Sequence, residues 1–402
     1  MIAIYTLTSP LHDEHAVAAT TTEFLSSLGI DYDFKGGDFA DYGTATLSLI
    51  YVRTGGTEGV FKTLLQQLRQ QSSQPIFLLT SGKSNSLAAS MEIMSYLHQQ
   101  GLKGEILHGS PIHVKQRIAD LLQLSTARQR LHGQRLGIIG QPSDWLISSH
   151  ADPIAVQSKL GVDLIELEIQ EVIEAFNNIS LDDCTLDICP RTEPVPEVTS
   201  ALPDARRLYH ALLHIIKKHR LSAFTIRCFD LLTAVHNTGC LALAQLNAEG
   251  IVAGCEGDVP AALSMMMCHA LLGFSGFQAN PSVIDPDTGM MTLAHCTIPL
   301  NMVSSYELDT HFESGIGVGI RGYMPLGPVT VFKANGDLSL HFVAEGQLIG
   351  NKRSNDLCRT QLLIRLDDTD SSNYFLTHPI GNHHIVVTGH HGQLLDQWCN
   401  SL

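Results

Sequence analysis

The first three quarters of the chain alternate between two patterns of apolar residues. Short runs that are apolar throughout predict buried strands, whereas apolar residues recurring every three to four positions predict helices. The predicted strands are residues 2–7, 47–52 and 75–79, and the predicted helices are residues 14–28, 59–71 and 86–100. Because strands alternate with helices, the pattern indicates a doubly wound parallel sheet.

A second unit of the same kind follows a candidate boundary at residues 128–134. Its predicted strands are residues 135–140, 162–167, 223–228 and 251–254, and its predicted helices are residues 204–219, 240–247 and 261–272.

The pattern changes after about residue 300. Short alternating runs at residues 327–333 and 338–343 flank Asn335-Gly336, a strong hairpin signal, and residues 362–366 and 384–388 are further strand candidates. We therefore predict an N-terminal α/β domain (1–130), a central α/β domain (131–300) and a C-terminal antiparallel, barrel-like β domain (301–402).

Composition narrows the class of protein. Of the 402 residues, 44% are hydrophobic, which is enough for substantial cores, and the formal net charge is −15 with no dense Lys/Arg run, so nucleic acid is an unfavourable partner. No apolar run approaches the ~18 residues that cross a bilayer, so we expect no membrane partner. The nine dispersed cysteines contain no C-x-x-C pair, and no basic region precedes the first apolar run. These features favour a cytoplasmic protein whose N-terminus is a first strand rather than a signal peptide.

The segment Cys255-Glu256-Gly257-Asp258-Val259-Pro260 joins a predicted strand to a predicted helix. Ligands of open α/β sheets collect beyond the carboxyl ends of strands, where Glu256 is expected to lie. Pro260 is tolerated in a first helical turn, and Asp258 stands where an N-cap belongs. Asp258 is therefore either a helix cap or a chemical group, whereas Glu256 has no such local role.

Several other side chains are candidates for chemistry. Neighbouring residues of a strand face opposite sides, so His383 and His384 cannot both enter one pocket, and each is either a metal ligand or a hydrogen-bonded structural residue. His295 ends a short apolar run and carries the same two alternatives. Trp145 follows a strand and either stacks its ring on a ligand or packs in the core. Three arginines, Arg53, Arg227 and Arg321, could each hold an anionic group.

One motif is set aside. Residues 317–322, Gly-Val-Gly-Ile-Arg-Gly, match the dinucleotide fingerprint in letters, but Pro325 and Gly327 exclude the helix that this fingerprint needs.

Taken together, the motifs between residues 250 and 395 resemble the superfamily of L-fucose and L-arabinose isomerases. The resemblance rests on several segments in one order, namely Cys255-Glu256-Gly257-Asp258, Met265-Met266-Met267-Cys268-His269, Phe277-Gln278-Ala279-Asn280, Gly289-Met290-Met291-Thr292-Leu293-Ala294-His295-Cys296, Ser314-Gly315-Ile316-Gly317, Gly327-Pro328-Val329-Thr330, and Gly381-Asn382-His383-His384 with the strand that follows. The N-terminal third is similar only in its α/β style.

The resemblance implies a metal-dependent aldose–ketose isomerase that acts on an open-chain sugar through an enediol intermediate. It implies a divalent metal, usually Mn²⁺, and a homo-oligomer with sites near subunit contacts. By motif position, Glu256 corresponds to a carboxylate that binds the metal and transfers protons, His383 to the C-terminal metal histidine, and His295 to an additional metal histidine. Asp258 is a second candidate for proton transfer, and Asn382, His384, Trp145 and Arg321 are the candidate sugar-binding residues.

Asn280 departs from the family pattern, because it stands where the superfamily has a second acidic ligand and base. An amide oxygen can ligate a metal but cannot take up a proton. Three functions remain open. The first is an isomerase that acts on a deoxy-hexose, a pentose, or an acidic or sulfonated sugar. The second is another metal-assisted enzyme, such as an epimerase or dehydratase, and the third is a carbohydrate-binding protein on an isomerase scaffold.

Overall fold

A computed structural model describes residues 1–72 and 74–402. Contacts within the chain divide it into two compact units, of which the first comprises residues 1–129 with Ser401 and the second residues 130–400 with Leu402. None of the helices in the described ranges is both long and apolar enough to cross a membrane.

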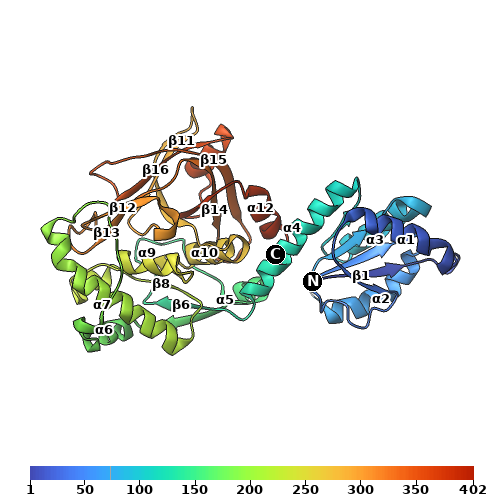
Figure 1. Ribbon diagram of the computed structural model, residues 1–402, viewed down its shortest axis with the longest axis horizontal. Coiled ribbons are helices and arrows are strands. Elements are labelled where there is room, and N and C mark those ends of the chain that lie inside the picture. The colour runs from blue at the N-terminus through green and yellow to red at the C-terminus, as the bar shows by residue number, and fades with distance from the viewer. Residues whose placement is uncertain (73) are drawn as a thin grey trace. The chain divides into compact units, whose positions relative to one another are not determined.

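The first unit is a five-stranded parallel sheet with helices in its connections, as the periodicity predicts (Figure 1). Its strands lie in the order β2-β1-β3-β4-β5, so the chain reverses its direction of winding between β1 and β3. Residues Ile4, Leu49 and Leu79 are fully buried because both faces of a parallel sheet are covered. The elements are β1 (Ile2–Leu7), α1 (Glu14–Leu28), β2 (Asp33–Gly36), β3 (Leu47–Val52), α2 (Glu58–Gln71), β4 (Ile76–Leu79), α3 (Ser86–Gln99), β5 (Gly104–Leu107) and α4 (Pro111–Leu131).

The second unit begins with another parallel sheet, of order β7-β6-β8-β9. The winding reverses between β6 and β8, and ligands of such sheets bind at this point, beyond the carboxyl ends of the strands. The elements are β6 (Arg135–Ile139), α5 (Pro153–Leu160), β7 (Asp163–Leu167), α6 (Ile169–Asn178), α7 (Pro196–His219), β8 (Ala223–Ile226), α8 (Asp230–Ala234), α9 (Cys240–Ala248), β9 (Val252–Cys255) and α10 (Val259–Leu272).

The rest of the second unit contains a closed six-stranded barrel, β10-β11-β16-β15-β14-β17, whose neighbouring strands are all antiparallel. Strands β12 and β13 form a separate two-stranded antiparallel sheet. The predicted combination of two α/β sheets and an antiparallel β-barrel is confirmed. The elements are β10 (Phe277–Asp285), β11 (Met290–His295), β12 (Ser305–Asp309), β13 (Gly319–Tyr323), β14 (Gly327–Ala334), β15 (His341–Asn351), β16 (Thr360–Leu366), α11 (Ser372–Thr377), β17 (His384–Thr388) and α12 (Gly392–Asn400).

The barrel takes its first two strands, β10 and β11, from residues before 300. The predicted hairpin at Asn335-Gly336 joins β14 to β15, but β15 begins only at His341. The loop before β15 is held by Asn335, whose Oδ1 accepts hydrogen bonds from the backbone N–H groups of Ser339 and Leu340. Gly336 is required here, since an added Cβ would lie 1.8 Å from the carbonyl oxygen of His150.

Helix α10 lies between the parallel sheet and the barrel (Figure 1) and contacts β8, β9, β14 and β17. All but two of its residues are buried, as expected for a helix covered on every side. Gln278 of β10 adds a polar link, because its side-chain oxygen accepts from the backbone N–H of Cys255 at 2.9 Å. The exit of β9 is thus fixed to the barrel.

Candidate metal centre and active site

The turn after β9 places Glu256 at the point where the parallel sheet meets the barrel. Glu256 has a left-handed backbone (φ 64°), as does Gly257 (φ 71°). An added Cβ at Gly257 would lie 2.8 Å from the carbonyl oxygen of Gln141, so the close approach of the β6 loop requires glycine. For Glu256 the left-handed conformation is costly, and strain of this kind is concentrated at functional sites.

The barrel register brings two histidines to this turn. Asn280 of β10 pairs with Ala294 of β11, while the adjacent Ala279 pairs with His384 of β17. The next residue along β11, His295, and the residue before β17, His383, therefore meet at the same place along β10. Their rings lie 5.4 Å apart between centroids, at 78°.

Three donor atoms converge from three separate elements. Glu256 Oε1 lies 3.5 Å from His295 Nε2 and 3.4 Å from His383 Nε2. Exposure is 8% for Glu256, 4% for His295 and 0% for His383. The donor atoms form a group that could hold a metal ion, all of them within 4.8 Å of one another.

These residues fit a divalent metal ion. Two donors about 2.1 Å from one ion and at the tetrahedral angle lie about 3.4 Å apart, which matches the observed separations. His383 Nε2 is buried and has no hydrogen-bond partner within residues 1–72 and 74–402, so none of these residues occupies the position that a metal would take. A carboxylate with two imidazoles is an established donor set for transition metals.

The outward ring nitrogens of both histidines are held by the protein. His295 Nδ1 lies 2.8 Å from Thr297 Oγ1, and His383 Nδ1 lies 2.8 Å from Asp258 Oδ2. Such outer contacts orient an imidazole so that its other nitrogen faces the metal. Both bonds therefore direct Nε2 toward Glu256.

Asp258 combines the two roles that the sequence left open. Its Oδ1 accepts from the backbone N–H of Ala261 at 2.8 Å and caps α10, while its Oδ2 contacts His383. The residue is fully buried, so it supports His383 rather than facing a ligand. Burial alone would raise its pKa, but Lys333 and His383 hold the pKa below its usual range.

The charges of the donor group are strongly linked. Burial would raise the pKa of Glu256, but the neighbouring His383 and His295 lower it below the ordinary value. For His383 burial acts in the opposite direction, yet Glu256 and Asp258 raise its pKa to about 9. Burial lowers the pKa of His295, which favours its neutral, ligating form.

Trp145 closes one side of the group. Its Nε1–H donates to Glu256 Oε2 at 2.6 Å, and its ring packs edge-on against Phe229 at 4.8 Å between centroids. The residue is 51% exposed, so part of the indole is open beside the carboxylate. Phe229 in turn contacts the ring of His311 at 5.6 Å, and burial lowers the pKa of His311 to about 4. No recognisable motif singles out Phe229 or His311 in the sequence, since both lie in loops.

The two amides predicted at the site lie together. Asn382 Nδ2 donates to Asn280 Oδ1 at 3.1 Å, which places this amide pair directly beside His383. Asn382 is exposed and Asn280 is half-buried.

His384 and Arg321 lie apart from the donor group. The ring of His384 is fully buried among aromatic residues, and its nitrogens contact the carbonyl oxygen of Asn382 (3.0 Å) and the hydroxyl of Tyr374 (3.0 Å). Burial lowers the pKa of His384 to about 3. With both nitrogens engaged, this ring offers none to a substrate.

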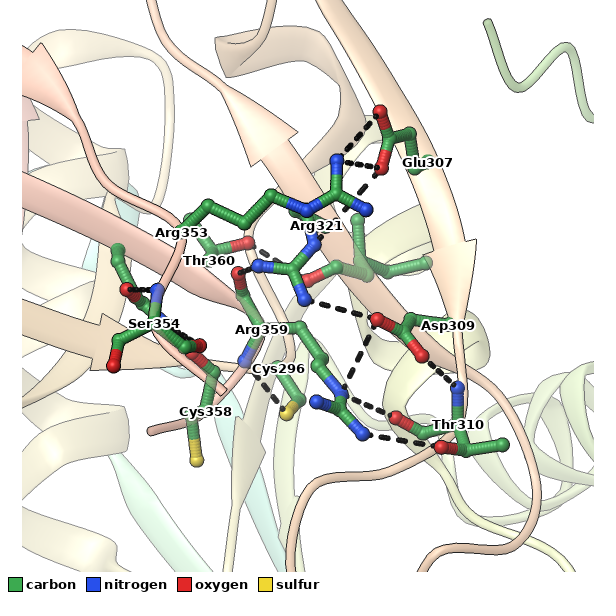
Figure 2. Close-up of polar contacts among 12 residues, drawn as sticks. Cys296, Glu307, Asp309, Thr310, Arg321, Arg353, Ser354, Cys358, Arg359 and Thr360 are labelled. Atoms are coloured by element: carbon green, nitrogen blue, oxygen red, sulfur yellow. Dashed lines mark hydrogen bonds and ion pairs between the residues drawn. The ribbon is translucent and has the colours of Figure 1, made fainter. Parts of the chain in front are cut away.

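Arg321 belongs to an ion-pair network between β12, β13 and the loop before β16 (Figure 2). Its Nη2 lies 2.9 Å from Asp309 Oδ2, its Nη1 donates to the carbonyl oxygen of Arg359, and only 2% of it is exposed. His384 and Arg321 are therefore not part of the proposed site.

The other two candidate arginines are also paired with acids. Arg53, in the first unit, forms an ion pair with Glu14, and Arg227, at the end of β8, forms ion pairs with Asp144 and Asp230.

Comparison with known proteins gives distant relatives. No family model matches the chain. The chain is similar to the sulfoquinovose isomerase of Clostridium sp. (strain MSTE9), with 25% identity over 223 residues that cover 54% of this chain and 48% of that protein. The sulfoquinovose isomerase of Priestia aryabhattai is 22% identical over 272 residues (62% and 59%), and that of Alkalicoccus urumqiensis is 20% identical over 229 residues (53% and 49%). The chain thus spans between 48% and 59% of the length of these curated relatives.

Proposed function

We propose that this protein is a metal-dependent aldose–ketose isomerase of the L-fucose and L-arabinose isomerase superfamily, and that its substrate is a sulfonated sugar. The observation that carries the proposal is the convergence of Glu256, His295 and His383, with the free nitrogen of His383 directed at the carboxylate. The similarity to sulfoquinovose isomerases supports both the reaction and the substrate class. The alternative functions are epimerisation, dehydration and sugar binding without catalysis, and the tests below distinguish isomerisation from them.

Glu256, His295 and His383 would hold the ion. When bound, a divalent ion supplies positive charge that stabilises an enediolate and is worth several kcal/mol in comparable enzymes. Mn²⁺ is the first ion to test, and Co²⁺ and Zn²⁺ follow because imidazole ligands also suit them.

Isomerisation moves a proton between C2 and C1, which requires a base within hydrogen-bond reach of the substrate. Glu256 is the carboxylate of the donor group, and with Asn280 in place of a second acid we assign the proton transfer to it. The Trp145 N–H holds Glu256 Oε2 and fixes the plane of the carboxylate. Asp258 acts through His383 and keeps that ring in place.

Substrate contacts are proposed for the polar and aromatic groups around the donor group. The open part of the Trp145 indole can lie against a sugar, whose C–H groups pack on an aromatic face. The amides of Asn280 and Asn382 can exchange hydrogen bonds with hydroxyl groups of an open-chain sugar.

The test is direct. Purified protein is stripped with EDTA, reloaded with Mn²⁺, Co²⁺ or Zn²⁺, and incubated with sulfoquinovose while NMR follows the appearance of the ketose. We expect a metal-dependent conversion of sulfoquinovose and weak or no conversion of glucose, which lacks the sulfonate. If no metal is retained and none changes the thermal stability, the proposal loses its mechanism; if metal binds but neither sugar reacts, a different reaction or a binding function is indicated.

A further inference from the structure

Lys333 is a buried lysine on strand β14, next to the site. Its side chain is 0% exposed, and its Nζ has no hydrogen-bond partner among the described residues. By alternation along β14 it shares a strand face with Val329 and Val331, which belong to the hydrophobic core. A buried ammonium is expensive unless an opposite charge compensates it, so its position calls for an explanation.

The compensating charge is Asp258. Lys333 Nζ lies 3.6 Å from Asp258 Oδ2, which is close enough for an ion pair. The same oxygen contacts His383 Nδ1 at 2.8 Å, and His383 Nε2 lies 3.4 Å from Glu256 Oε1. Lysine, aspartate and histidine thus form one buried series that ends at the donor group, with all three side chains fully enclosed.

Each member constrains the next. Asp258 Oδ1 is fixed because it accepts the capping hydrogen bond of α10. The carboxylate therefore has one orientation, in which Oδ2 faces both Lys333 and His383. Outer carboxylates of this kind orient metal-binding histidines, and their loss typically weakens metal binding about 10- to 100-fold. Breaking a buried ion pair on one side leaves an uncompensated charge and disturbs the remaining partner.

We propose that Lys333 is a positioning residue for the metal site, which acts by compensating the buried Asp258 carboxylate and thereby fixing His383 with its Nε2 toward the metal. The inference rests on the proposed metal site of Glu256, His295 and His383. Lys333 itself is enclosed and touches neither metal nor substrate.

The test measures metal affinity, which does not depend on turnover. Lys333→Met keeps the unbranched apolar stem of the side chain and removes its terminal ammonium group. The affinity of this variant for Mn²⁺ is measured by chelator competition, with the visible spectrum of the Co²⁺ form as a second readout. We expect affinity about 10- to 100-fold below that of the unaltered protein, a changed Co²⁺ spectrum, and partial recovery in Lys333→Arg. The matched control is Lys159→Met, because Lys159 donates to the carbonyl oxygens of Asp337 and Leu338 and is not part of the series; we expect unchanged affinity.

A double-substitution cycle separates this role from a general loss of structure. Asp258→Asn keeps an oxygen for the cap but removes the charge, and Lys333→Met combined with it removes both buried charges. If Lys333 acts through Asp258, the double variant binds Mn²⁺ as weakly as Asp258→Asn alone. Losses that multiply would overturn the inference, as would unaltered affinity in Lys333→Met. If Lys333→Met does not fold, the comparison of the double variant with Asp258→Asn decides. Failure of the unaltered protein to bind metal would instead refute the proposed function.

Discussion

Replacing Trp145 by phenylalanine removes one hydrogen bond from the metal-site carboxylate and leaves an aromatic ring in place. The bond is short, 2.6 Å from Nε1 to Glu256 Oε2, and its acceptor is a largely buried carboxylate. Hydrogen bonds to charged groups contribute about 1.5–3 kcal/mol. Because Trp145 is 51% exposed, water can partly replace the N–H, so we expect the lower end, about 1.5 kcal/mol.

If this free energy is lost from the metal-bound state, the Mn²⁺ affinity falls about tenfold, because each 1.4 kcal/mol is about one factor of ten. The assay is the Mn²⁺ affinity by calorimetry, followed by kcat/KM for sulfoquinovose. The matched control is Phe229→Leu, which removes the ring contact with Trp145 and leaves the hydrogen bond to Glu256 intact. The reasoning is refuted if Trp145→Phe binds Mn²⁺ and turns over like the unaltered protein, or if Phe229→Leu weakens both quantities equally.

Three further predictions concern Glu256, His383 and the neighbouring His384. Glu256→Gln should abolish isomerisation and weaken Mn²⁺ binding by more than about 100-fold, beyond the usual effect of an outer residue; normal turnover of this variant would exclude Glu256 as the base. Burial lowers the pKa of His383, but Glu256 and Asp258 raise it to about 9, and a metal needs the neutral ring. The Mn²⁺ affinity should therefore rise with pH up to about 9, and metal binding at pH 8 should release close to one proton, which calorimetry in two buffers measures. A Mn²⁺ affinity that is independent of pH between 6 and 8 would contradict this. Burial lowers the pKa of His384 to about 3, so its contribution to stability is complete above the unfolded pKa of about 6.5 and is lost as the pH falls toward 3. Between pH 7 and pH 5 the free energy of unfolding, measured with urea, should fall by about 2 kcal/mol less in His384→Gln than in the unaltered protein. An equal pH dependence in both proteins would count against this.

The parts of the fold that local patterns determine could be predicted from the sequence. Helix α1 and strands β1, β3 and β17 lie where periodicity places them, because buried strands and amphipathic helices leave distinct patterns. The sequence pattern does not assign the hairpin of β10 and β11 to the barrel, since its place is set by pairing with β17 and β16, far along the chain. Such register is a property of the folded sheet and not of a local window.

The site could be predicted in its residue types but not in its connections. The position at a strand end makes Glu256 and His295 candidates, whereas the choice of His383 over His384 rests on the resemblance to the isomerase superfamily. The opposite directions of His383 and His384 follow from alternation. That Asp258 serves both as cap and as partner of His383 depends on a contact across 125 residues. Lys333 left one signal, a charged residue on the core face of an apolar strand, but the acid that compensates it is visible only in the structure.

Hydrogen exchange at C2 of sulfoquinovose in D₂O is the most direct test of the central claim that Glu256, His295 and His383 form a metal-dependent isomerase site. Protein loaded with Mn²⁺ is incubated with the sugar, and NMR and mass spectrometry follow deuterium in recovered substrate and product, with EDTA-treated protein and Glu256→Gln as controls. The account predicts deuterium at C2 of the aldose and C1 of the ketose only in the metal-loaded, unaltered protein. Metal-loaded protein that yields neither exchange nor ketose, or equal exchange in Glu256→Gln, would contradict it.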